Sequence, residues 1–354
     1  MKSINELREE SIALLQQMIA TPSVSRDEAC VADVIQQFML DKGLLVNRQN
    51  NNLWIHSNNC ADDRPTILLN SHIDTVKPAA GYTRDPYQPT IEGDCLYGLG
   101  SNDAGAPMVS LLAAFRYLTQ KEQPYHLIYA CTAEEEVSGK NGIESLLPQL
   151  GHVDLAIVGE PTSMQPAVAE KGLMVLDCAA YGKSGHAARN EGVNAIYEAL
   201  PNIEWFRTYK FDRISQFLGP VKMSVTQINA GTQHNVVPDV CRFVVDVRVN
   251  ELYSNVELLE LIKSHTSCEV KERSTRLNSS SISAEHPIVK RCIELGLKPF
   301  GSPTMSDQAL MPFTSIKIGP GESSRSHTAD EYVRLSEIEH GINMYVELLD
   351  GLQL

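Results

Sequence analysis

The chain has 354 residues, of which 43% are hydrophobic and 21% are charged, and its formal net charge is −14. This length exceeds one ordinary hydrophobic core and is enough for two domains. The balance is typical of a soluble globular protein, and an acidic excess without a Lys/Arg cluster argues against nucleic acid or an anionic membrane as a partner.

Two further features of the sequence concern the compartment. The first residues lack the pattern of a signal peptide, and no apolar stretch reaches 18 residues. The eight cysteines are scattered singly, without a CxxC pair, which favours free thiols in a reducing compartment. We therefore expect a cytoplasmic protein. The cysteines are Cys30, Cys60, Cys95, Cys131, Cys178, Cys241, Cys268 and Cys292.

The first 171 residues alternate between helix and strand patterns. Ser3 and Glu6 have the spacing of a capping box before an amphipathic helix, and Ser25 and Glu28 repeat it before a second helix that Gly43 ends. A third helix is predicted to start near Pro107. Such alternation predicts an α/β fold with a mostly parallel sheet sandwiched by helices. The predicted strands are 44–46, 53–56, 66–70, 96–99, 126–130 and 154–158, with a later one at 314–318.

The pattern changes after Glu170. The order up to residue 271 is strand, helix, strand, strand, helix, strand, which is the split βαβ pattern of a ferredoxin-like α+β sandwich. We predict one domain from residues 1–171 and 276–354, and a second domain, 172–275, inserted into it. The inserted strands are 173–181, 221–229, 241–250 and 269–271, and its helices lie near 195–209 and 254–265; helices at 287–295 and 336–352 follow.

Potential metal ligands follow the predicted buried strands. In an open α/β sheet, ligands bind at the carboxyl ends of the strands. Each residue alone is more often a surface or turn residue, but their joint placement predicts one metal site built from distant segments. The residues are His72, Glu134-Glu135-Glu136, Glu160 and His327, together with Asp103 at the start of a helix.

The chemistry of this set suits two divalent ions. His72 and His327 offer nitrogen ligands for Zn²⁺ or Co²⁺, and Asp103, Glu136 and Glu160 offer oxygen ligands. Asp103, short and held by glycine-rich backbone, is the natural ligand to bridge two ions. One glutamate then remains beside the ligands for proton transfer.

The spacing of these residues, with Asp74 two positions after His72, resembles the M20 metallopeptidase and amidohydrolase family. It is most similar to the group of acetylornithine deacetylases and succinyl-diaminopimelate desuccinylases. The resemblance covers nearly the whole chain. The segments that carry it are GlySerAsnAspAlaGly (100–105), ThrAlaGluGluGlu (132–136), ValGlyGluProThr (158–162) and SerHisThrAlaAspGluTyr (326–332).

The resemblance implies a role for each site residue. His72, Asp103 and Glu160 would hold one ion, and Asp103, Glu136 and His327 the other, with Zn²⁺ preferred and Co²⁺ as the alternative. Glu135 would be the general base, and Asp74 would orient His72. Glu134 has no implied role, and plain exposure is expected for it. A cis peptide bond is implied between Asp103 and Ala104.

The inserted domain carries a second part of the resemblance, which implies a homodimer. His186, in Gly182–Ala187, resembles the histidine that reaches the partner subunit's active site and stabilises an oxyanion. Asn235 resembles a residue that contacts substrate, and Arg248 one that binds the substrate carboxylate. Read without the resemblance, His186 is a surface residue and Arg248 is equally suited to a structural ion pair.

The expected activity is metal-dependent removal of an acetyl or succinyl group from an N2-acyl amino acid, chiefly N2-acyl-ornithine in arginine biosynthesis. Succinyl-diaminopimelate desuccinylation and dipeptide hydrolysis are the alternatives. Ala104-Gly105 and Ala187 depart from the family pattern at the pocket wall, which affects the substrate rather than the reaction class. A homologue that binds metal or a ligand without catalysis is a further alternative, but every ligand position and Glu135 are filled by competent residues.

Overall fold

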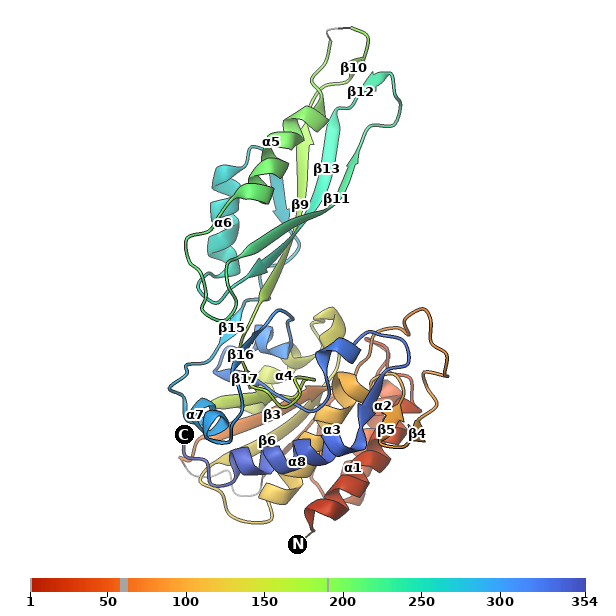
Figure 1. Cartoon of the computed structure of the whole chain (residues 1–354), viewed down its shortest axis with the longest axis vertical. Coiled ribbons are helices and arrows are strands. Elements are labelled where there is room, and N and C mark those ends of the chain that lie inside the picture. The colour runs from red at the N-terminus through yellow and green to blue at the C-terminus, as the bar shows by residue number, and fades with distance from the viewer. Residues whose placement is uncertain (1, 58–62, 190) are drawn as a thin grey trace. The chain divides into compact units, whose positions relative to one another are not determined.

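The computed structural model describes residues 2–57, 63–189 and 191–354. The chain forms two compact units, drawn in Figure 1. The first contains the chain up to Val168 together with Ser281–Phe300 and Ser306–Leu354, and the second contains Ala169–Ser280 and Gly301–Met305. The stretch 172–275, for which an inserted domain is predicted, falls inside the second unit.

A nine-stranded mixed sheet has the order β1-β2-β6-β3-β7-β17-β8-β15, with β16 beside β8. Its central strands β6, β3, β7 and β17 are parallel neighbours, whereas β2 joins β6, and β8 joins β17, in antiparallel fashion. The expected α/β class is confirmed. The strands are β1 Asn47–Gln49, β2 Asn52–His56, β3 Thr66–His72, β6 His126–Thr132, β7 Leu155–Val158, β8 Ala167–Glu170, β15 Ser280–Ser281, β16 Phe300–Ser302 and β17 Ser315–Lys317.

Helices cover both faces of this sheet because its buried strands are apolar on both sides. In β3, Ile67 and Leu69 join the larger hydrophobic core with α1, α2, α3, α7 and α8, while Leu68 joins a smaller core with α4. Helices α3 and α8 pack against each other (Figure 1). The helices are α1 Ile4–Ile19, α2 Ala29–Asp41, α3 Ala106–Leu118, α4 Ile143–Leu150, α7 Pro287–Glu294 and α8 Leu335–Leu349, and a small sheet contains β4 Thr90–Glu92, β5 Cys95–Tyr97 and β18 Tyr332–Arg334.

Local signals gave mixed results at the helix ends. The Ser3–Glu6 capping box is confirmed, but the one predicted at Ser25 is wrong. Helix α2 begins at Ala29 with Glu28 as its N-cap, and the hydroxyl of Ser25 instead donates to the carboxylate of Asp74 at 2.7 Å. The hydroxyl of Ser25 is therefore the donor to a distant carboxylate and does not act as the acceptor of a helix cap. The strand expected at 44–46 begins three residues later, as β1.

The second unit has the ferredoxin-like topology expected for it. Its antiparallel sheet has the order β11-β13-β9-β14, and the chain order is β9-α5-β11-β13-α6-β14. Both helices contribute to one hydrophobic core with the sheet. The elements are β9 Gly172–Tyr181, α5 Ala195–Thr208, β11 Lys222–Ala230, β13 Val240–Val249, α6 Asn255–His265 and β14 Glu269–Glu272, with a two-stranded pair of β10 Gly185–His186 and β12 Val236–Val237.

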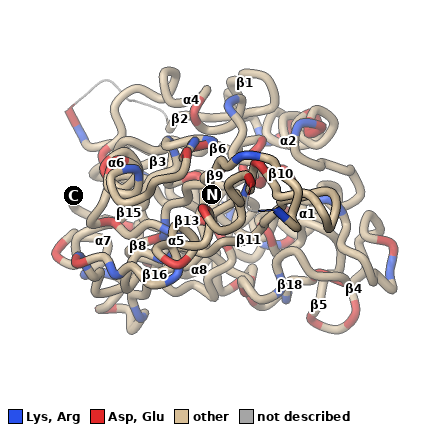
Figure 2. Tube along the Cα trace, turned by 90° about the horizontal axis from the view of Figure 1, so that it is seen from above, with Lys and Arg blue, Asp and Glu red and all other residues tan. Residues whose placement is uncertain are grey.

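The expected free thiols are present wherever a cysteine is described. Seven cysteines are free, and Cys131, Cys178, Cys241 and Cys292 are buried, whereas Cys30 is exposed. Cys60 lies outside the described residues. No helix in the described part of the chain has both the length and the apolar character that a membrane span requires. Figure 2 shows acidic and basic residues interspersed along the trace.

Candidate metal centre

The parallel strands bring the predicted ligands to one edge of the sheet. His72 is the last residue of β3, Glu135 and Glu136 lie in a short 3-10 turn (Glu135–Val137) after β6, and Glu160 follows β7 by two residues. His327 follows β17 after a loop. Because β6, β3, β7 and β17 are adjacent and parallel, their carboxyl ends meet at this edge.

Asp103 lies between the two histidines. Its Oδ1 is 3.2 Å from Nε2 of His72, and its Oδ2 is 3.7 Å from Nε2 of His327. The carboxylate of Glu136 lies 2.9 Å from the same nitrogen of His327. One aspartate therefore offers an oxygen to each side of the site, which is the arrangement that a bridging ligand requires.

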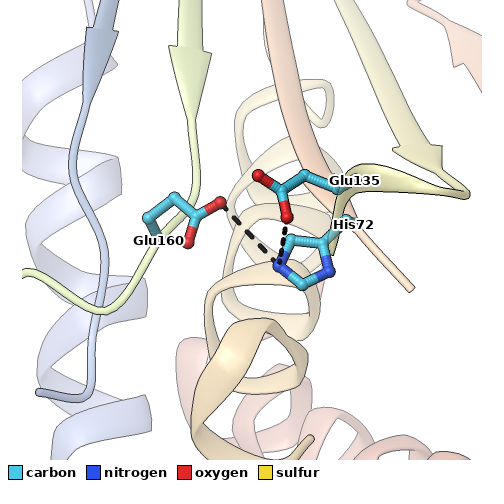
Figure 3. Close-up of side chains that lie close together, drawn as sticks. All are labelled: His72, Glu135 and Glu160. Atoms are coloured by element: carbon cyan, nitrogen blue, oxygen red, sulfur yellow. Dashed lines mark ion pairs between the residues drawn. The ribbon is translucent and has the colours of Figure 1, made fainter. Parts of the chain in front are cut away.

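Two glutamates complete the surroundings of His72. Glu160 Oε1 is 3.8 Å and Glu135 Oε2 is 3.9 Å from its Nε2. Figure 3 shows both carboxylates directed at the imidazole from different strand ends. Among the residues that the structure describes, two groups of three have ligand atoms close enough to share one ion: His72 with Glu135 and Glu160, and His72 with Asp103 and Glu136. Glu135 is therefore close enough to His72 to serve either as a metal ligand or as a proton-transfer group beside the ligands.

The electrostatics of the site favour bound positive charge. Burial alone would lower the pKa of His72, but hydrogen bonds with Asp103 and Asp74 and the charges of Glu135 and Glu160 raise that pKa well above its ordinary value. A hydrogen bond with Glu136 raises the pKa of His327 to about 9. The partly buried carboxylates that raise the pKa of both histidines would attract a divalent cation in the same way.

The glutamates near His72 are difficult to ionise together. Burial, opposed by the charge of His72, raises the pKa of Glu160 to about 8 and that of Glu135 well above its ordinary value. Asp103 differs, because its hydrogen bond with His72 outweighs burial and lowers its pKa. Nitrogen and carboxylate donors of this kind fit Zn²⁺ or Co²⁺, so the residues present are suited to a metal centre.

Asp74 connects His72 to the glutamate turn. The Nδ1 of His72 lies 3.0 Å from the backbone oxygen of Asp74 and 3.5 Å from its carboxylate. That carboxylate also accepts the backbone N–H groups of Glu135 and Glu136, at 3.0 and 3.1 Å. With the hydroxyl of Ser25, these contacts hold the ring orientation of one ligand and the backbone of two further site residues together.

Exposure of Glu134 was predicted, and this is wrong. The residue is 7% exposed; its side chain accepts hydrogen bonds from Asn141, and its backbone N–H donates to Glu28. With a φ of +57°, Glu134 forms the left-handed residue that turns the chain from β6 into the Glu135–Glu136 segment. The run of three acidic residues concealed this role, because such runs usually lie on a solvated surface.

Asp103 is presented by an irregular turn, Ser101–Gly105, that precedes α3. The preceding Gly100 has a φ of +75°, and the peptide bond between Asp103 and Ala104 is cis, as the family resemblance implied. The backbone of this turn donates hydrogen bonds to the buried carboxylate of Glu331, a residue that the sequence analysis did not single out. Its position in SerHisThrAlaAspGluTyr, four residues after His327, was the available signal.

Asp307 is a second buried carboxyl group that sequence reasoning missed. Its Oδ2 accepts hydrogen bonds from Asn70 in β3 (2.9 Å) and Thr132 in β6 (2.8 Å). Burial raises its pKa to about 6. Its only signal was a Ser-Asp pair in a loop, which by itself predicts a turn.

The remaining predicted residues belong to the second unit. His186 is exposed in β10, and its Nδ1 accepts the backbone N–H of Ala188 at 3.1 Å. Asn235 precedes β12, and its backbone oxygen accepts the N–H of Ala187, so it lies beside the His186 segment. Arg248 makes a bidentate ion pair with Asp246, at 2.9 and 3.1 Å, which matches the structural alternative considered for it.

The overall structure resembles solved structures of hydrolytic enzymes. Aminopeptidase PepT from Bacillus cereus superposes with a TM-score of 0.79 at 18% identity, covering 97% of this chain and 98% of that chain. The M20 family metallo-carboxypeptidase Sso-CP2 from Sulfolobus solfataricus gives a TM-score of 0.74 at 17% identity, with coverage of 96% and 98%. The dinuclear metal-binding peptidase YXEP from Bacillus subtilis gives 0.76 at 15% identity, with 98% of both chains covered. At these identities the likeness establishes the fold.

Sequence comparison goes further. A [LysW]-lysine/[LysW]-ornithine hydrolase from Sulfurisphaera tokodaii is 27% identical over 302 residues, which are 81% of this chain and 82% of the relative. The sequence pattern of peptidase family M20/M25/M40 matches residues 68–351, a stretch that includes every residue of the candidate metal centre. This chain therefore belongs to peptidase family M20/M25/M40.

Proposed function

We propose that this protein is a metal-dependent amide hydrolase that releases ornithine from an N2-acyl-ornithine, as a step of arginine biosynthesis. The observation that supports the proposal is the placement of Asp103, which has one oxygen near His72 and the other near His327. Glu135 lies beside this set, 3.9 Å from His72. Hydrolysis of an unactivated amide needs stabilisation of the developing oxyanion and a base for water, and this set of groups can provide both.

Two divalent ions, Zn²⁺ by preference and Co²⁺ as the alternative, would be held by His72, Asp103 and Glu160 on one side and by Asp103, Glu136 and His327 on the other. When bound, they would supply Lewis-acid chemistry that polarises the amide carbonyl and acidifies water. Each ligand residue in this assignment has a carboxylate or imidazole atom within 3.8 Å of another member of its set.

Glu135 would accept the proton of the attacking water on a carboxylate oxygen and return it to the nitrogen of the leaving amine. Burial raises the pKa of Glu135, and a carboxylate with a raised pKa is a better base near neutral pH than an exposed one. Asp74 would hold the Nε2 of His72 toward the site by accepting the Nδ1 proton on its backbone oxygen. Glu135 would thus act on substrate, and Asp74 through its neighbours.

We further propose a homodimer formed through the second unit, in which His186 serves the active site of the partner subunit. Strand β11 is at the edge of its sheet, with Ile228 53% exposed, and α5 exposes Tyr197 and Leu200. An open edge strand beside exposed apolar side chains is suited to pairing with a second copy of the chain. Asn235 and Arg248 would contact substrate, the latter after release from Asp246. Light scattering at working concentration tests the dimer.

The substrate assignment has two variants. The family resemblance favours a small acyl group, acetyl or succinyl, on the α-nitrogen of ornithine. The Sulfurisphaera tokodaii relative is described as acting on [LysW]-lysine and [LysW]-ornithine. This relative makes a LysW-linked amino acid the second candidate. In both candidate substrates, the reaction would cleave an amide bond to a nitrogen of a basic amino acid and release that amino acid.

Hydrolysis of a matched substrate panel by the Zn²⁺- or Co²⁺-loaded protein tests this proposal. The panel contains N2-acetyl-ornithine, N2-succinyl-ornithine, the corresponding lysine compounds, LysW-linked ornithine, succinyl-diaminopimelate and several dipeptides. We expect one acyl-ornithine to be preferred at least tenfold in kcat/KM, which corresponds to about 1.4 kcal/mol in transition-state binding. Preference for a dipeptide or for succinyl-diaminopimelate would reject the ornithine assignment, and no hydrolysis by a metal-loaded protein would reject the proposed function.

A further inference from the structure

A buried carboxylate that belongs to neither ligand set holds the turn that carries Asp103. Glu331 is 2% exposed and lies directly before β18. Its Oε1 accepts the backbone N–H groups of Asn102 (2.8 Å) and Asp103 (3.0 Å), and its Oε2 accepts that of Gly100 (3.0 Å). One side chain therefore serves three backbone donors of a single turn.

These donors need such a partner because the turn cannot satisfy them itself. The first N–H groups of a helical segment have no intrahelical acceptor, and a buried donor without a partner is costly. Asp103 and Ala104 also depart from helical dihedral angles, so the ordinary bonding pattern is interrupted here. A charged acceptor makes stronger hydrogen bonds than a neutral one and favours one backbone geometry over others.

The same carboxylate lies in the segment that carries His327. At one end of this segment, Asn102 pairs with Glu322, donating from Nδ2 to its backbone oxygen (3.0 Å) and accepting its N–H on Oδ1 (2.9 Å). At the other end, the backbone oxygen of Glu331 accepts the N–H of Gly98 at 2.9 Å. The turn of Asp103 and the segment of His327 are thus joined on both sides of His327.

We propose that Glu331 is a positioning residue of the metal centre, which holds the turn from Gly100 to Asp103 so that one Asp103 oxygen faces His72 and the other faces His327. This inference rests on the proposed function. The hydrogen bonds of the Glu331 carboxylate go to backbone N–H groups of the turn rather than to His72 or His327. It acts through the backbone of Asp103.

Glu331→Gln tests the inference with a nearly isosteric change. The amide NH₂ group would face backbone N–H groups in either orientation, so a donor would meet a donor and the turn would have to shift. Asp330→Asn is the matched control. Asp330 accepts the backbone N–H groups of Thr83 (2.9 Å) and Arg84 (3.1 Å), a segment that carries no candidate ligand. Its φ of +54° is tolerated by asparagine.

The measurements are Zn²⁺ affinity by competition with a chelator, the visible absorption of the Co²⁺-loaded protein, and thermal unfolding of the metal-free form. For Glu331→Gln we expect at least a tenfold loss of Zn²⁺ affinity, an altered Co²⁺ spectrum and a kcat that falls more than KM rises. Asp330→Asn should keep the wild-type affinity and spectrum.

A folded Glu331→Gln protein with wild-type Zn²⁺ affinity and an unchanged Co²⁺ spectrum would overturn the inference. If this variant does not fold, Glu331→Asp replaces it, because it keeps the charge but shortens the reach to the three donors; wild-type affinity and spectrum in that variant overturn the inference equally. A wild-type protein that binds no metal would reject the proposed function and the inference with it. A metal-binding wild type with an unaffected variant rejects the inference alone.

Discussion

Asp74 contacts the imidazole of His72 at two points: the Nδ1 atom of His72 lies 3.0 Å from the backbone oxygen of Asp74 and 3.5 Å from its carboxylate. The ring is thereby fixed with Nε2 toward Asp103, Glu135 and Glu160. Since Asp74 also accepts the N–H groups of Glu135 and Glu136, a change at this residue reaches three members of the site.

Asp74→Asn should therefore weaken metal binding by about 10–100-fold, because an amide has one acceptor oxygen where the carboxylate serves three protein donors. Titration with Zn²⁺ against a competing chelator measures this loss. Asp154→Asn is the control, since Asp154 accepts the N–H of Thr66 (2.8 Å) at the opposite end of β3. Equal affinities for wild type and Asp74→Asn would show that Asp74 does not support the ligands.

Glu135→Gln should retain both metal ions and lose about 10²–10⁴-fold in kcat, because only the proton transfer is removed. Glu136→Gln, one residue along, should instead lose metal affinity, since its carboxylate lies 2.9 Å from His327. Metal content and single-turnover rates of the two variants separate these roles. Loss of metal from Glu135→Gln would make Glu135 a ligand, which its 3.9 Å distance from His72 also permits.

Removal of metal should lower the melting temperature, and Zn²⁺ should restore it. Several partly buried carboxylates lie close together at the site, so a divalent cation would relieve their mutual repulsion and would bind the folded state selectively. A ligand at 100 times its Kd stabilises by about 2.7 kcal/mol. Asp103→Asn should respond little to Zn²⁺, because it loses the carboxylate charge shared by both sides. A melting temperature of the wild type that is indifferent to Zn²⁺ contradicts the assignment.

His186→Ala should lower kcat by about 10²–10³-fold and change KM less, if His186 stabilises the oxyanion in the partner's site. His234→Ala is a suitable control, because His234 is also exposed and lies one residue before Asn235. Mixed dimers of His186→Ala with Glu135→Gln should recover activity in one of their two sites. A larger effect on KM than on kcat would make His186 a binding residue only.

Glu10→Gln should destabilise the protein in a pH-dependent way. Burial alone would raise the pKa of Glu10, but hydrogen bonds from Lys2, Lys42 and Arg116 lower it from 4.5 to about 2. Its stabilising contribution is therefore complete above pH 4.5 and is lost as the pH falls toward 2.

We expect wild type to exceed Glu10→Gln by about 1–2 kcal/mol in free energy of unfolding at pH 7, allowing for solvent screening at this partly exposed position. The difference should shrink toward zero near pH 2. Chemical unfolding at a series of pH values measures it, with Glu9→Gln, an exposed neighbour, as the control. A difference that is constant with pH would mean that the ion pairs contribute nothing.

Much of the fold follows from short-range information in the sequence. The runs 66–70 and 126–130 are mostly apolar, with the apolar residues 67–69 and 127–130 at their centres, as is typical of strands buried on both faces, and they became β3 and β6. The strand and helix order after Glu170 was sufficient for the ferredoxin-like topology, since this order admits few sheet arrangements. The placement of His72, Glu135, Glu136, Glu160 and His327 past strand ends predicted that they would meet, because parallel strands end at one edge.

Tertiary structure decided the contacts that no local pattern contains. Ser25 has the spacing of a helix cap, in which its oxygen would accept a backbone N–H, yet its hydroxyl instead donates to the carboxylate of Asp74, 49 residues away, which only the folded chain brings within reach. Glu134 is buried rather than exposed, and its contacts also come from other segments: its side chain accepts a hydrogen bond from Asn141, and its backbone N–H donates to Glu28. The partners of Glu331 lie more than 220 residues earlier in the chain. The sequence alone indicated the order and type of most elements and the polar residues that follow the parallel strands. The exact ends of some elements and the orientation of the site residues depended on hydrogen bonds between distant segments, whose energies arise only when folding has brought the segments together and excluded water.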